Sequence, residues 1–317
     1  MSEFSLIEKY FKPLQGKLQY VDVGIGDDCA VVSVPSGFEL AMSMDTLVEG
    51  IHFFPDVNPE DLGYKALAVN LSDLAAMGAM PKWFTLSVTL PEENEAWLQS
   101  FCSGMQDLIK QYPISLIGGD TTRGPLSITI QVHGMMREGQ RLLRSTAKVG
   151  DKIFVSGLLG DAGLALNAKM QKIALSPEAL ASVESRLLRP EPRLSLGRLL
   201  LASASSMIDL SDGLIGDLGH LAKASGVAAE IFCEKLPLSK YMQAHVDSTG
   251  DFTLPLSAGD DYELCFTVPP TSVQTCRCDV KDQAVAITEV GRIVPGSGVT
   301  CLLNGEEVEQ GRGYQHF

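Results

Sequence analysis

Hydrophobic and polar positions follow two different periods along the first half of the chain. Short apolar or β-branched runs predict strands at residues 30–34, 39–44, 83–90, 114–117 and 127–135. Longer helical patterns lie at residues 58–77 and 94–111. Strands that alternate with helices in this way are typical of α/β layering, so we expect a first α/β domain.

A polar stretch separates this half from a second α/β pattern. It runs from Arg137 to Asp151, and Lys152 begins a new strand. The pattern then predicts a Gly-rich turn, a helix to about Lys169, two Leu/Ala-rich helices split at residues 190–192, a short strand at 207–208, a helix at 214–224 and further strands. We therefore predict two domains, residues 1–148 and residues 149–317.

The composition agrees with two folded domains. The chain has 317 residues against roughly 100 to 200 per domain, and its 45% hydrophobic residues can supply two cores. The longest stretch without Asp, Glu, Lys or Arg has 13 residues, fewer than the roughly 18 that a membrane-spanning helix needs. The N-terminus lacks a basic start and an apolar block for export, so we expect a cytoplasmic protein without membrane contact.

Charge and cysteine usage exclude several classes of partner. The formal net charge is -14 and no run of Lys or Arg occurs, so nucleic acid would be repelled over most of the surface. The seven cysteines include no Cys-x-x-Cys pair, and the five histidines show no ligand spacing with them, which disfavours a zinc site and a disulfide framework. A small anionic ligand stays compatible if cations mediate its binding.

The aspartates carry the chemical information. Five times an apolar or Gly-bearing segment ends in Asp, at Asp27–Asp28, Asp45, Asp120, Asp209 with Asp212, and Asp260–Asp261. Each case alone fits an ordinary turn, because Asp and Gly favour turns. Together they indicate a ligand site, because ligands of open α/β folds collect at the carboxyl ends of strands.

Asp73 lies in a segment that is apolar nearly all round. Between Ala66 and Met80 only Asn70, Ser72 and Asp73 are strongly polar, so we expect a buried helix. A lone buried carboxylate is costly unless it is protonated, paired or bound to a metal, and no Lys or Arg lies one helical turn away. We interpret Asp73 as a metal ligand; the alternative is an Asp on a narrow solvent-facing stripe.

The oxygen-rich set of candidate ligands favours a hard cation. Neither Cys or His clusters nor an Asp-x-Asp-x-Asp-Gly calcium loop is present, so Mg²⁺ is preferred over Ca²⁺. Magnesium commonly completes its coordination shell with substrate phosphates. The acidic residues therefore predict a site for an anion.

Common phosphate and hydrolase motifs are missing. The chain has no P-loop, no protein-kinase signature and no Gly-x-Ser-x-Gly elbow. The loop from Gly157 to Gly163 could present backbone N–H groups to phosphate, although tight packing explains its glycines about as well. Asp209 and Asp212 are spaced Asp-x-x-Asp, so an aspartyl-phosphate phosphatase is only a competitor. His52 could reach a bound ligand, although a lone His is more often structural.

Six motifs, taken in order, resemble the thiamine-monophosphate kinase family. They are Gly24-Ile-Gly-Asp-Asp28, Asp45-Thr-Leu-Val-Glu-Gly-x-His52-Phe, the run from Asp61 to Gly78, Gly118-Gly-Asp-Thr-Thr-Arg-Gly124, Ile208-Asp-Leu-Ser-Asp-Gly-Leu214 and Asp261-Tyr-Glu-Leu264. The resemblance runs from about residue 4 to the C-terminus. It implies the fold of the aminoimidazole-ribonucleotide-synthetase-like ATP-binding proteins, with an N-terminal α/β domain that pairs with its copy in a homodimer and a C-terminal α/β sandwich.

The resemblance also implies an activity and a set of site residues. ATP and thiamine monophosphate would give ADP and thiamine diphosphate with the help of several Mg²⁺ ions. The family's metal-binding positions match Asp28, Ser43, Asp45, Asp73, Asp120, Asp209 and Asp212; its ATP-contacting positions match Gly119, Asp120, Arg144 and Ser211; and its positions beside thiamine match His52, Asp260 and Tyr314.

Two residues depart from the family pattern. Members commonly have Ser or Thr before the Asp of the second motif, where this chain has Met44, so a metal contact there has to use the main-chain oxygen. The usual Gly-Gly-Glu-Asp-Tyr-Glu is Ala258-Gly-Asp-Asp-Tyr-Glu263 here. Asp260 is one methylene shorter than Glu, so its carboxylate reaches less far towards the substrate.

The expected mechanism is direct in-line transfer without a phosphoenzyme. Negative charge spreads over the γ-phosphoryl oxygens in the transition state, so positioning and neutralisation by Mg²⁺ and Arg144 dominate. The acceptor phosphate oxygen is largely ionised at neutral pH, which makes a strong general base unnecessary. The alternatives are a related ATP-dependent ligase acting on an amide or formyl substrate, a Mg²⁺-dependent phosphatase, and a non-catalytic nucleotide or thiamine-phosphate binding protein.

Overall fold

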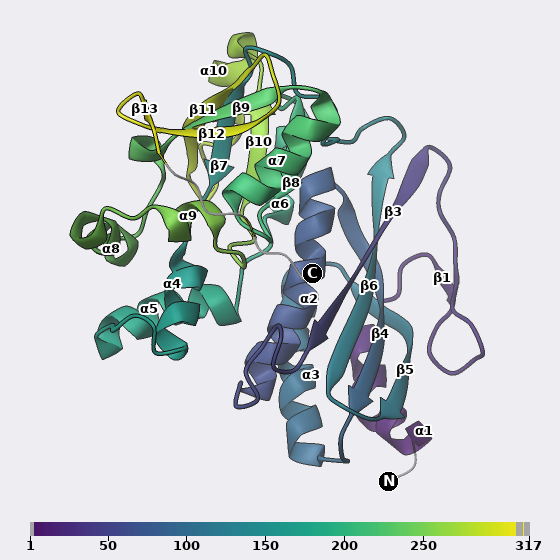
Figure 1. Ribbon diagram of the computed structural model, residues 1–317. Coiled ribbons are helices and arrows are strands. Elements are labelled where there is room, and N and C mark those ends of the chain that lie inside the picture. The colour runs from purple at the N-terminus through teal and green to yellow at the C-terminus, as the bar shows by residue number, and fades with distance from the viewer. Residues whose placement is uncertain (1–2, 309–312, 314–317) are drawn as a thin grey trace. The chain divides into compact units, whose positions relative to one another are not determined.

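The chain forms two compact units in the computed structural model, which describes residues 3–308 and residue 313 (Figure 1). Among these residues, the first unit extends to Leu74 and resumes over Ala79–Gln140, and the second takes Ala75–Gly78 and the residues from Arg141 onward. The division falls inside the polar stretch that separates the two sequence patterns. Within the described residues, every helix is too short or too polar to cross a membrane.

The first unit is built on a four-stranded sheet with the strand order β3-β6-β4-β5. Its strands are β3 (Phe38–Val48), β4 (Met80–Leu90), β5 (Ser115–Arg123) and β6 (Ser127–Arg137). Strand β6 is antiparallel to both β3 and β4, whereas β4 and β5 are parallel. Strands β3 and β5 are therefore the two edges of the sheet.

Two long helices of the first unit cover one face of this sheet, α2 (Pro59–Met77) and α3 (Glu95–Gln111) (Figure 1). Both agree with the helices that the sequence predicts to within a residue. Most residues of α2 are buried, as its apolar composition predicts. Helix α3 begins after Asn94, whose side chain accepts the N–H of Trp97 at 3.0 Å.

Helices α2 and α3 approach each other through two glycines. A Cβ added to Gly63 would lie 1.9 Å from the main-chain oxygen of Phe101, and one added to Gly104 would lie 1.8 Å from that of Glu60. Only a residue without a side chain fits at either position. The two helices therefore pack in close main-chain contact at these positions.

The opposite face of the sheet is partly covered by a short hairpin. It consists of β1 (Val21–Val23) and β2 (Val31–Val32), so only the centre of the predicted strand at 30–34 is a strand. Its apolar residues pack with a cluster around Trp83, and the Trp83 indole donates to the main-chain oxygen of Gln19 at 2.9 Å. The chain reaches this hairpin through α1 (Glu3–Leu6), the π-helical turn η1 (Ile7–Phe11) and the 3₁₀ helix η2 (Lys12–Gln15).

The second unit is built on a seven-stranded sheet with the order β13-β12-β9-β11-β7-β10-β8. Its strands are β7 (Lys152–Ser156), β8 (Ser206–Asp209), β9 (Ala228–Phe232), β10 (Leu264–Val268), β11 (Ile287–Val294), β12 (Gly298–Leu303) and β13 (Glu306–Glu307). All neighbours are antiparallel except β12 and β9. Strands β7 and β8 confirm the predicted strands of this half.

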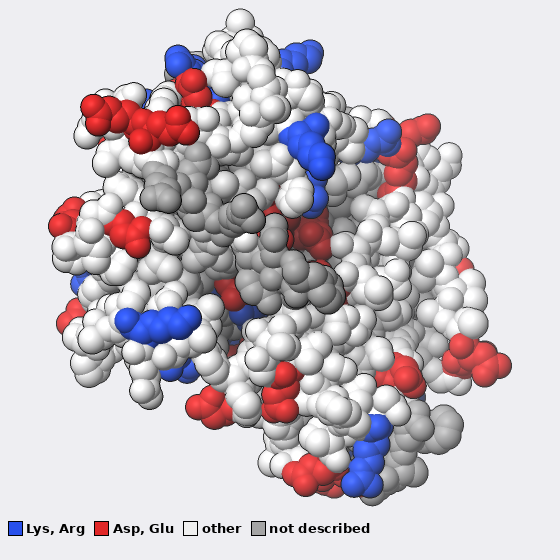
Figure 2. Space-filling model, viewed as in Figure 1, with Lys and Arg blue, Asp and Glu red and all other residues white. Residues whose placement is uncertain are grey.

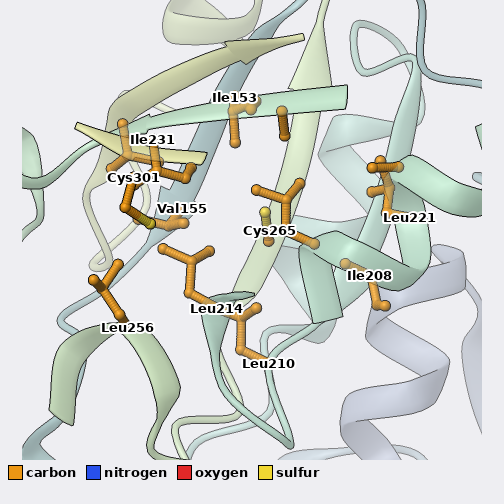
Figure 3. Close-up of a cluster of buried hydrophobic side chains, with 14 of the residues drawn as sticks. Ile153, Val155, Ile208, Leu210, Leu214, Leu221, Ile231, Leu256, Cys265 and Cys301 are labelled. Atoms are coloured by element: carbon orange, nitrogen blue, oxygen red, sulfur yellow. The ribbon is translucent and has the colours of Figure 1, made fainter. Parts of the chain in front are cut away.

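The helices of the second unit are α4 (Asp161–Lys169), α5 (Pro177–Leu188), α6 (Leu194–Leu200), α7 (Leu214–Ser225), α8 (Lys240–Thr249), α9 (Thr253–Ser257) and α10 (Val273–Asp279), with 3₁₀ helices η3 (Cys233–Lys235) and η4 (Pro270–Ser272). Helix α7 packs on the sheet and closes the main core. Figure 3 shows Leu214 and Leu221 of α7 with Ile208, Val155 and Cys265 of the strands. This packing holds the loop between β8 and α7 in place.

Candidate functional site

In the first unit, Ser43, Asp45 and Asp73 lie on one side of the sheet at its β3 edge. The Ser43 hydroxyl donates to Asp73 Oδ2 at 2.5 Å, which joins β3 to α2. The main-chain N–H of Asp45 donates to Asn70 Oδ1 at 3.0 Å. The Asp73 side chain is half-buried in an otherwise buried part of α2. The structure thus brings three of the predicted metal ligands together, all of them oxygen donors.

Met44 points away from this cluster. Successive strand residues face opposite sides of a sheet, and the Met44 side chain is 61% exposed on the other side. The Asp45 N–H bonds to Asn70, away from β6, so the alternation of an antiparallel ladder directs the Met44 main chain towards β6. The metal contact expected of the Met44 main-chain oxygen therefore has no support from the strand geometry.

Asp120 lies on β5, the opposite edge of the same sheet. Across the sheet, Thr46 of β3 pairs with Thr129 of β6, which pairs with Ser87 of β4, which pairs with Asp120 of β5. Paired residues face the same side of a sheet, so Asp120 is on the side of Thr46 and not on that of Asp45. Gly119 lets β5 approach β4, because an added Cβ would lie 1.9 Å from the Leu86 main-chain oxygen. Within one chain, the structure does not bring Asp120 to the Ser43–Asp73 cluster.

Two further predicted residues of the first unit lie in loops. Asp28 is exposed in the loop between β1 and β2, and its N–H donates to Asp27 Oδ1 at 2.8 Å. His52 is half-buried after β3, and its Nδ1 accepts the Val48 N–H at 3.0 Å. Since Nδ1 is an acceptor, the proton of a neutral His52 is on Nε2, and that nitrogen is the one able to donate.

In the second unit, Asp209, Ser211 and Asp212 follow one another at the end of β8. Asp209 is buried, and the loop after it turns into α7. The Asp212 N–H donates to Asp217 Oδ2 at 3.0 Å, which ties the loop to the first turn of α7. Gly313 also lies against this loop, because an added Cβ would be 3.0 Å from the Asp212 main-chain oxygen. Tyr314 lies outside the described residues.

Asp217 is a buried carboxyl group that sequence reasoning did not identify. Burial raises the pKa of Asp217 to about 7, and the negative charge of Asp212 adds to the rise. The Asp212 N–H and the positive charge of Arg144 oppose it. Arg144 is therefore close enough to Asp217, in the first turn of α7, to act on its charge. The signal in the sequence was an Asp one turn into a helix.

Asp260 reaches the same loop from a distant part of the chain. Its N–H donates to the Ser211 main-chain oxygen at 2.9 Å, and the N–H of Tyr262 donates to that of Leu210 at 2.8 Å. Asp260 has a φ of 69° and Tyr262 a φ of 47°, both in the left-handed region that residues with a side chain seldom adopt. The structure therefore brings Asp209, Ser211, Asp212 and Asp260 together.

The loop from Gly157 to Gly163 uses its backbone N–H groups inside the protein. The Gly160 N–H donates to both carboxylate oxygens of Asp261 at 3.0 Å, and the Leu159 N–H donates to the Pro237 oxygen at 3.0 Å. Burial raises the pKa of Asp261 well above its ordinary value. A carboxyl group of the chain thus takes the place that a phosphate would need, and this favours tight packing over phosphate binding.

The donor set fits a hard cation. The side chains that could bind a metal are a hydroxyl and carboxylates, and these are the ligands that Mg²⁺ prefers. Among the described residues, no group of three or more His, Cys, Asp or Glu side chains forms a ready cluster. On the face shown in Figure 2, the visible Lys and Arg side chains are scattered among acidic ones. This face therefore has no broad basic surface of the kind that binds nucleic acid.

Two family models match the chain. AIR synthase related protein, N-terminal domain, matches residues 26–136, and AIR synthase related protein, C-terminal domain, matches residues 148–304. Together they confirm the two-domain fold that the resemblance implies.

Curated proteins and solved structures match over nearly their whole length. The chain is 48% identical to thiamine-monophosphate kinase of Escherichia coli (strain K12), over 99% of this chain and 98% of that protein. It is 46% identical to the Haemophilus influenzae protein of the same name, over 100% and 98%. The crystal structure of thiamine-monophosphate kinase from Stenotrophomonas maltophilia K279a has a TM-score of 0.87, 41% identity and coverage of 97% and 98%. A structure of AaThiL complexed with AMPPCP and TMP has a TM-score of 0.77, 35% identity and coverage of 99% and 97%.

Proposed function

The chain belongs to the thiamine-monophosphate kinase family of ATP-dependent phosphotransferases, and from this premise we propose how its own residues perform the transfer. The γ-phosphoryl group of ATP passes directly to the phosphate of thiamine monophosphate, giving ADP and thiamine diphosphate. The observation that carries the proposal is the Ser43–Asp73 pair at 2.5 Å, with Asp45 on the same side of the sheet. A cytoplasmic location stays a prediction from the N-terminal sequence.

We assign the binding of several Mg²⁺ ions to the oxygen donors. The residues are Asp28, Ser43, Asp45, Asp73, Asp120, Asp209 and Asp212. Magnesium, when bound, neutralises phosphate charge that a protein of net charge -14 would otherwise repel. The protein holds these donors on rigid elements: β3 and α2 fix Ser43 and Asp73, and the packed end of β8 fixes Asp209.

The nucleotide and the acceptor are assigned to different residues. Gly119, Asp120, Arg144 and Ser211 contact ATP, and Arg144 supplies a fixed positive fork for phosphate oxygens. His52 and Asp260 lie beside the thiamine portion. In support, the positive charge of Arg144 acts on Asp217 in the first turn of α7, and Asp260 is bonded to Ser211 through its main chain.

The site residues favour direct transfer over an aspartyl-phosphate intermediate. Asp209 is buried at the end of β8, and the main chain of Asp212 is tied to Asp217. Asp209 is therefore not an exposed nucleophile, and the Asp-x-x-Asp spacing differs from the Asp-x-Asp spacing of that phosphatase class. The chain's groups therefore bind, orient and neutralise, which is how most phosphoryl transfer is catalysed.

We also propose that the enzyme works as a homodimer paired through its first unit. Asp45 and Asp120 are on opposite edges of the sheet, three interstrand spacings or roughly 14 Å apart. Ligands of one Mg²⁺ lie about 2.1 Å from it, so Asp45 and Asp120 of one chain cannot share an ion. A second copy whose β5 edge meets this β3 edge would supply Asp120 of the partner subunit.

The exposed side of β3 supports this pairing. Its outward residues are Leu40, Met42 and Met44, and their exposed fractions are 36%, 60% and 61%. An apolar row of this kind along a sheet edge is typical of a surface that a partner covers.

One assay tests the function. Purified protein is incubated with ATP, Mg²⁺ and thiamine monophosphate, and ADP and thiamine diphosphate are measured. We expect the two products in equal amounts and no ADP without thiamine monophosphate. Release of inorganic phosphate from thiamine monophosphate without ATP would indicate a phosphatase. ADP formation that requires an amide or formyl substrate would indicate a ligase, and ligand-induced thermal stabilisation without turnover would indicate a binding protein.

A further inference from the structure

Glu263 is a fully buried carboxylate on the segment that carries Asp260. It accepts four side-chain hydrogen bonds. Arg193 donates from Nε to Oε2 at 2.7 Å and from Nη2 to Oε1 at 2.6 Å, Arg186 Nη2 donates to Oε1 at 2.5 Å, and the Ser156 hydroxyl donates to Oε2 at 2.5 Å. A two-point Arg–carboxylate pair fixes orientation as well as distance, so Glu263 has one permitted position.

The segment is anchored a second time two residues earlier. Both Asp261 oxygens accept the N–H of Gly160 at the start of α4. Asp260 and Tyr262, on either side of Asp261, are the two residues in the left-handed region. Such conformations persist only where the surroundings impose them. The alternation of buried anchors with left-handed residues indicates that the anchors impose the backbone shape.

The other side of the segment rests on the β8–α7 loop. Asp260 and Tyr262 donate their N–H groups to Ser211 and Leu210, and the Leu210 N–H donates to the Glu263 main-chain oxygen at 2.8 Å. Six residues therefore hold the four residues 260–263: Ser156, Gly160, Arg186, Arg193, Leu210 and Ser211. Of their contacts, the Arg193–Glu263 pair joins the segment to the chain 70 residues away.

We propose that Arg193 and Glu263 are positioning residues of the phosphotransferase, whose ion pair imposes the left-handed backbone at Asp260 and so aims the Asp260 carboxylate at the thiamine substrate. The inference rests on the proposed function, because it takes Asp260 as a substrate-facing residue. Neither Arg193 nor Glu263 touches a reactant; both act through Asp260. The short Asp side chain makes this placement more demanding, since it cannot reach as far as Glu.

The first test replaces the Arg193 guanidinium by an ammonium group, which keeps the positive charge. Arg193→Lys loses the two-point contact, and we expect kcat/KM for thiamine monophosphate to fall at least 10-fold while the KM for ATP stays within 3-fold of wild type. The matched control is Arg292→Lys, which changes an exposed pair in which Arg292 Nε lies 2.7 Å from Glu230. Circular dichroism at the assay temperature verifies that both variants are folded. A KM for ATP that rises by as large a factor as kcat/KM for thiamine monophosphate falls would indicate a general structural effect and overturn the proposal.

A double-mutant cycle asks whether Arg193 acts through Asp260. In an Asp260→Ala background, Arg193→Lys should lower kcat/KM for thiamine monophosphate by less than 2-fold, because the group that it positions is already gone. If the two losses multiply instead, Arg193 acts independently of Asp260 and the assignment is wrong.

Gly157→Ala disturbs the same Arg193–Glu263 contact from the side of Glu263. This variant tests the proposal by itself if Arg193→Lys does not fold. A Cβ on Gly157 would lie 2.0 Å from Glu263 Oε1, so the methyl group displaces the carboxylate without altering either arginine. We expect a similar loss for thiamine monophosphate. Gly250→Ala is the control, because Gly250 has a similar positive φ of 69° and nothing within 4 Å of an added Cβ.

The outcomes separate this proposal from the proposed function. A wild-type protein that makes no ADP in response to thiamine monophosphate defeats the function. A wild-type protein that is active, with Gly157→Ala folded and within 2-fold of its kcat/KM, defeats only the positioning role.

Discussion

Asp73 shows how one polar residue in an apolar helix can indicate a site. The sequence predicts a helix that is buried nearly all round, and α2 confirms it. The carboxylate itself is half-buried and accepts the Ser43 hydroxyl. Hydrophobic periodicity predicts the helix, but the Ser43 partner 30 residues away depends on where β3 packs.

Replacing Asp73 tests its proposed role as a metal ligand. We expect Asp73→Asn to lower kcat at least 100-fold, about 3 kcal/mol in the barrier, because the amide lacks the charge that the metals require. The melting temperature should change by only a few degrees, since Asn still accepts from Ser43. ADP formation at saturating substrates is the measurement.

Met44→Thr is the matched substitution beside this cluster. Because the Met44 side chain is on the opposite side of β3 from the cluster, and Thr adds no charge to the apolar row, we expect turnover within 3-fold of wild type. Near wild-type turnover of Asp73→Asn would remove Asp73 from the site.

The buried Asp217 should make stability depend on pH. Its pKa is about 7 in the folded chain, above its ordinary value of 3.8. As pH rises from about 4 to 7, the unfolded chain loses a proton that the folded chain keeps, so the free energy of unfolding falls. The full effect is about 4 kcal/mol and is complete above pH 7.

Asp217→Asn should remove this part of the pH dependence. Urea denaturation in the presence of a chelator at several pH values between 4 and 8 gives the measurement, with the exposed Asp282→Asn as the control. An Asp217→Asn variant whose stability falls over this range as steeply as that of wild type would contradict the assignment.

At the scale of elements, the helices of the first unit were easier to predict than its strand ends, whereas α8, α9 and α10 of the second unit lie where the pattern predicts only strands. The apolar pattern places α2 and α3 within a residue, because α2 is a long segment that is apolar nearly all round and α3 has a continuous apolar face. The predicted strands at 39–44 and 114–117 stop early, and β3 and β5 run on to Val48 and Arg123. Asp45 and Asp120 thus lie inside strands, since pairing with β6 and β4 continues where the apolar pattern has ended.

The α2–α3 crossing gives a prediction for one element pair. Gly104→Ala would raise the stability of an open helix by roughly 0.5–1 kcal/mol. Here the added methyl meets the Glu60 main-chain oxygen, which cannot yield without moving α2, so we expect a loss of about 3 kcal/mol instead. Chemical denaturation measures it.

The adjacent Ser103→Ala serves as the control for this crossing, since Ser103 is only partly buried on the same helix. Its stability should change by no more than about 0.5 kcal/mol. A stabilised Gly104→Ala variant would show that the helices have room to separate.

At the scale of the whole molecule, the order of motifs identified the family, and physical reasoning predicts the ion. Scattered carboxylates and a net charge of -14 lead to Mg²⁺ and an anionic ligand, but no residue pattern by itself names thiamine. The strand order β3-β6-β4-β5 is likewise hidden, because neighbours in the sheet are not neighbours in the chain. For that reason the sequence could not show that Asp45 and Asp120 lie on opposite edges. The sequence did not reveal the Arg193–Glu263 pair either, because these residues are 70 positions apart and only the fold brings them together.

Pairing through β3 predicts a variant that separates the subunits. Met42→Glu places a charge on the exposed apolar row, and we expect the protein to sediment as a monomer and lose most of its activity. Met170→Glu, at an exposed methionine of the second unit, should leave both properties unchanged. A Met42→Glu variant that is dimeric and active would place the interface elsewhere.

The separation of Asp45 and Asp120 across one sheet has a consequence for mixtures of damaged chains. If each site draws on two copies, inactive Asp45→Asn protein and inactive Asp120→Asn protein would regain activity when their subunits are exchanged. Half of the sites in each hybrid would then receive both intact carboxylates, while the other half would receive neither. Activity regained by mixing two inactive variants would thus show that each site takes Asp45 of β3 from one subunit and Asp120 of β5 from the other.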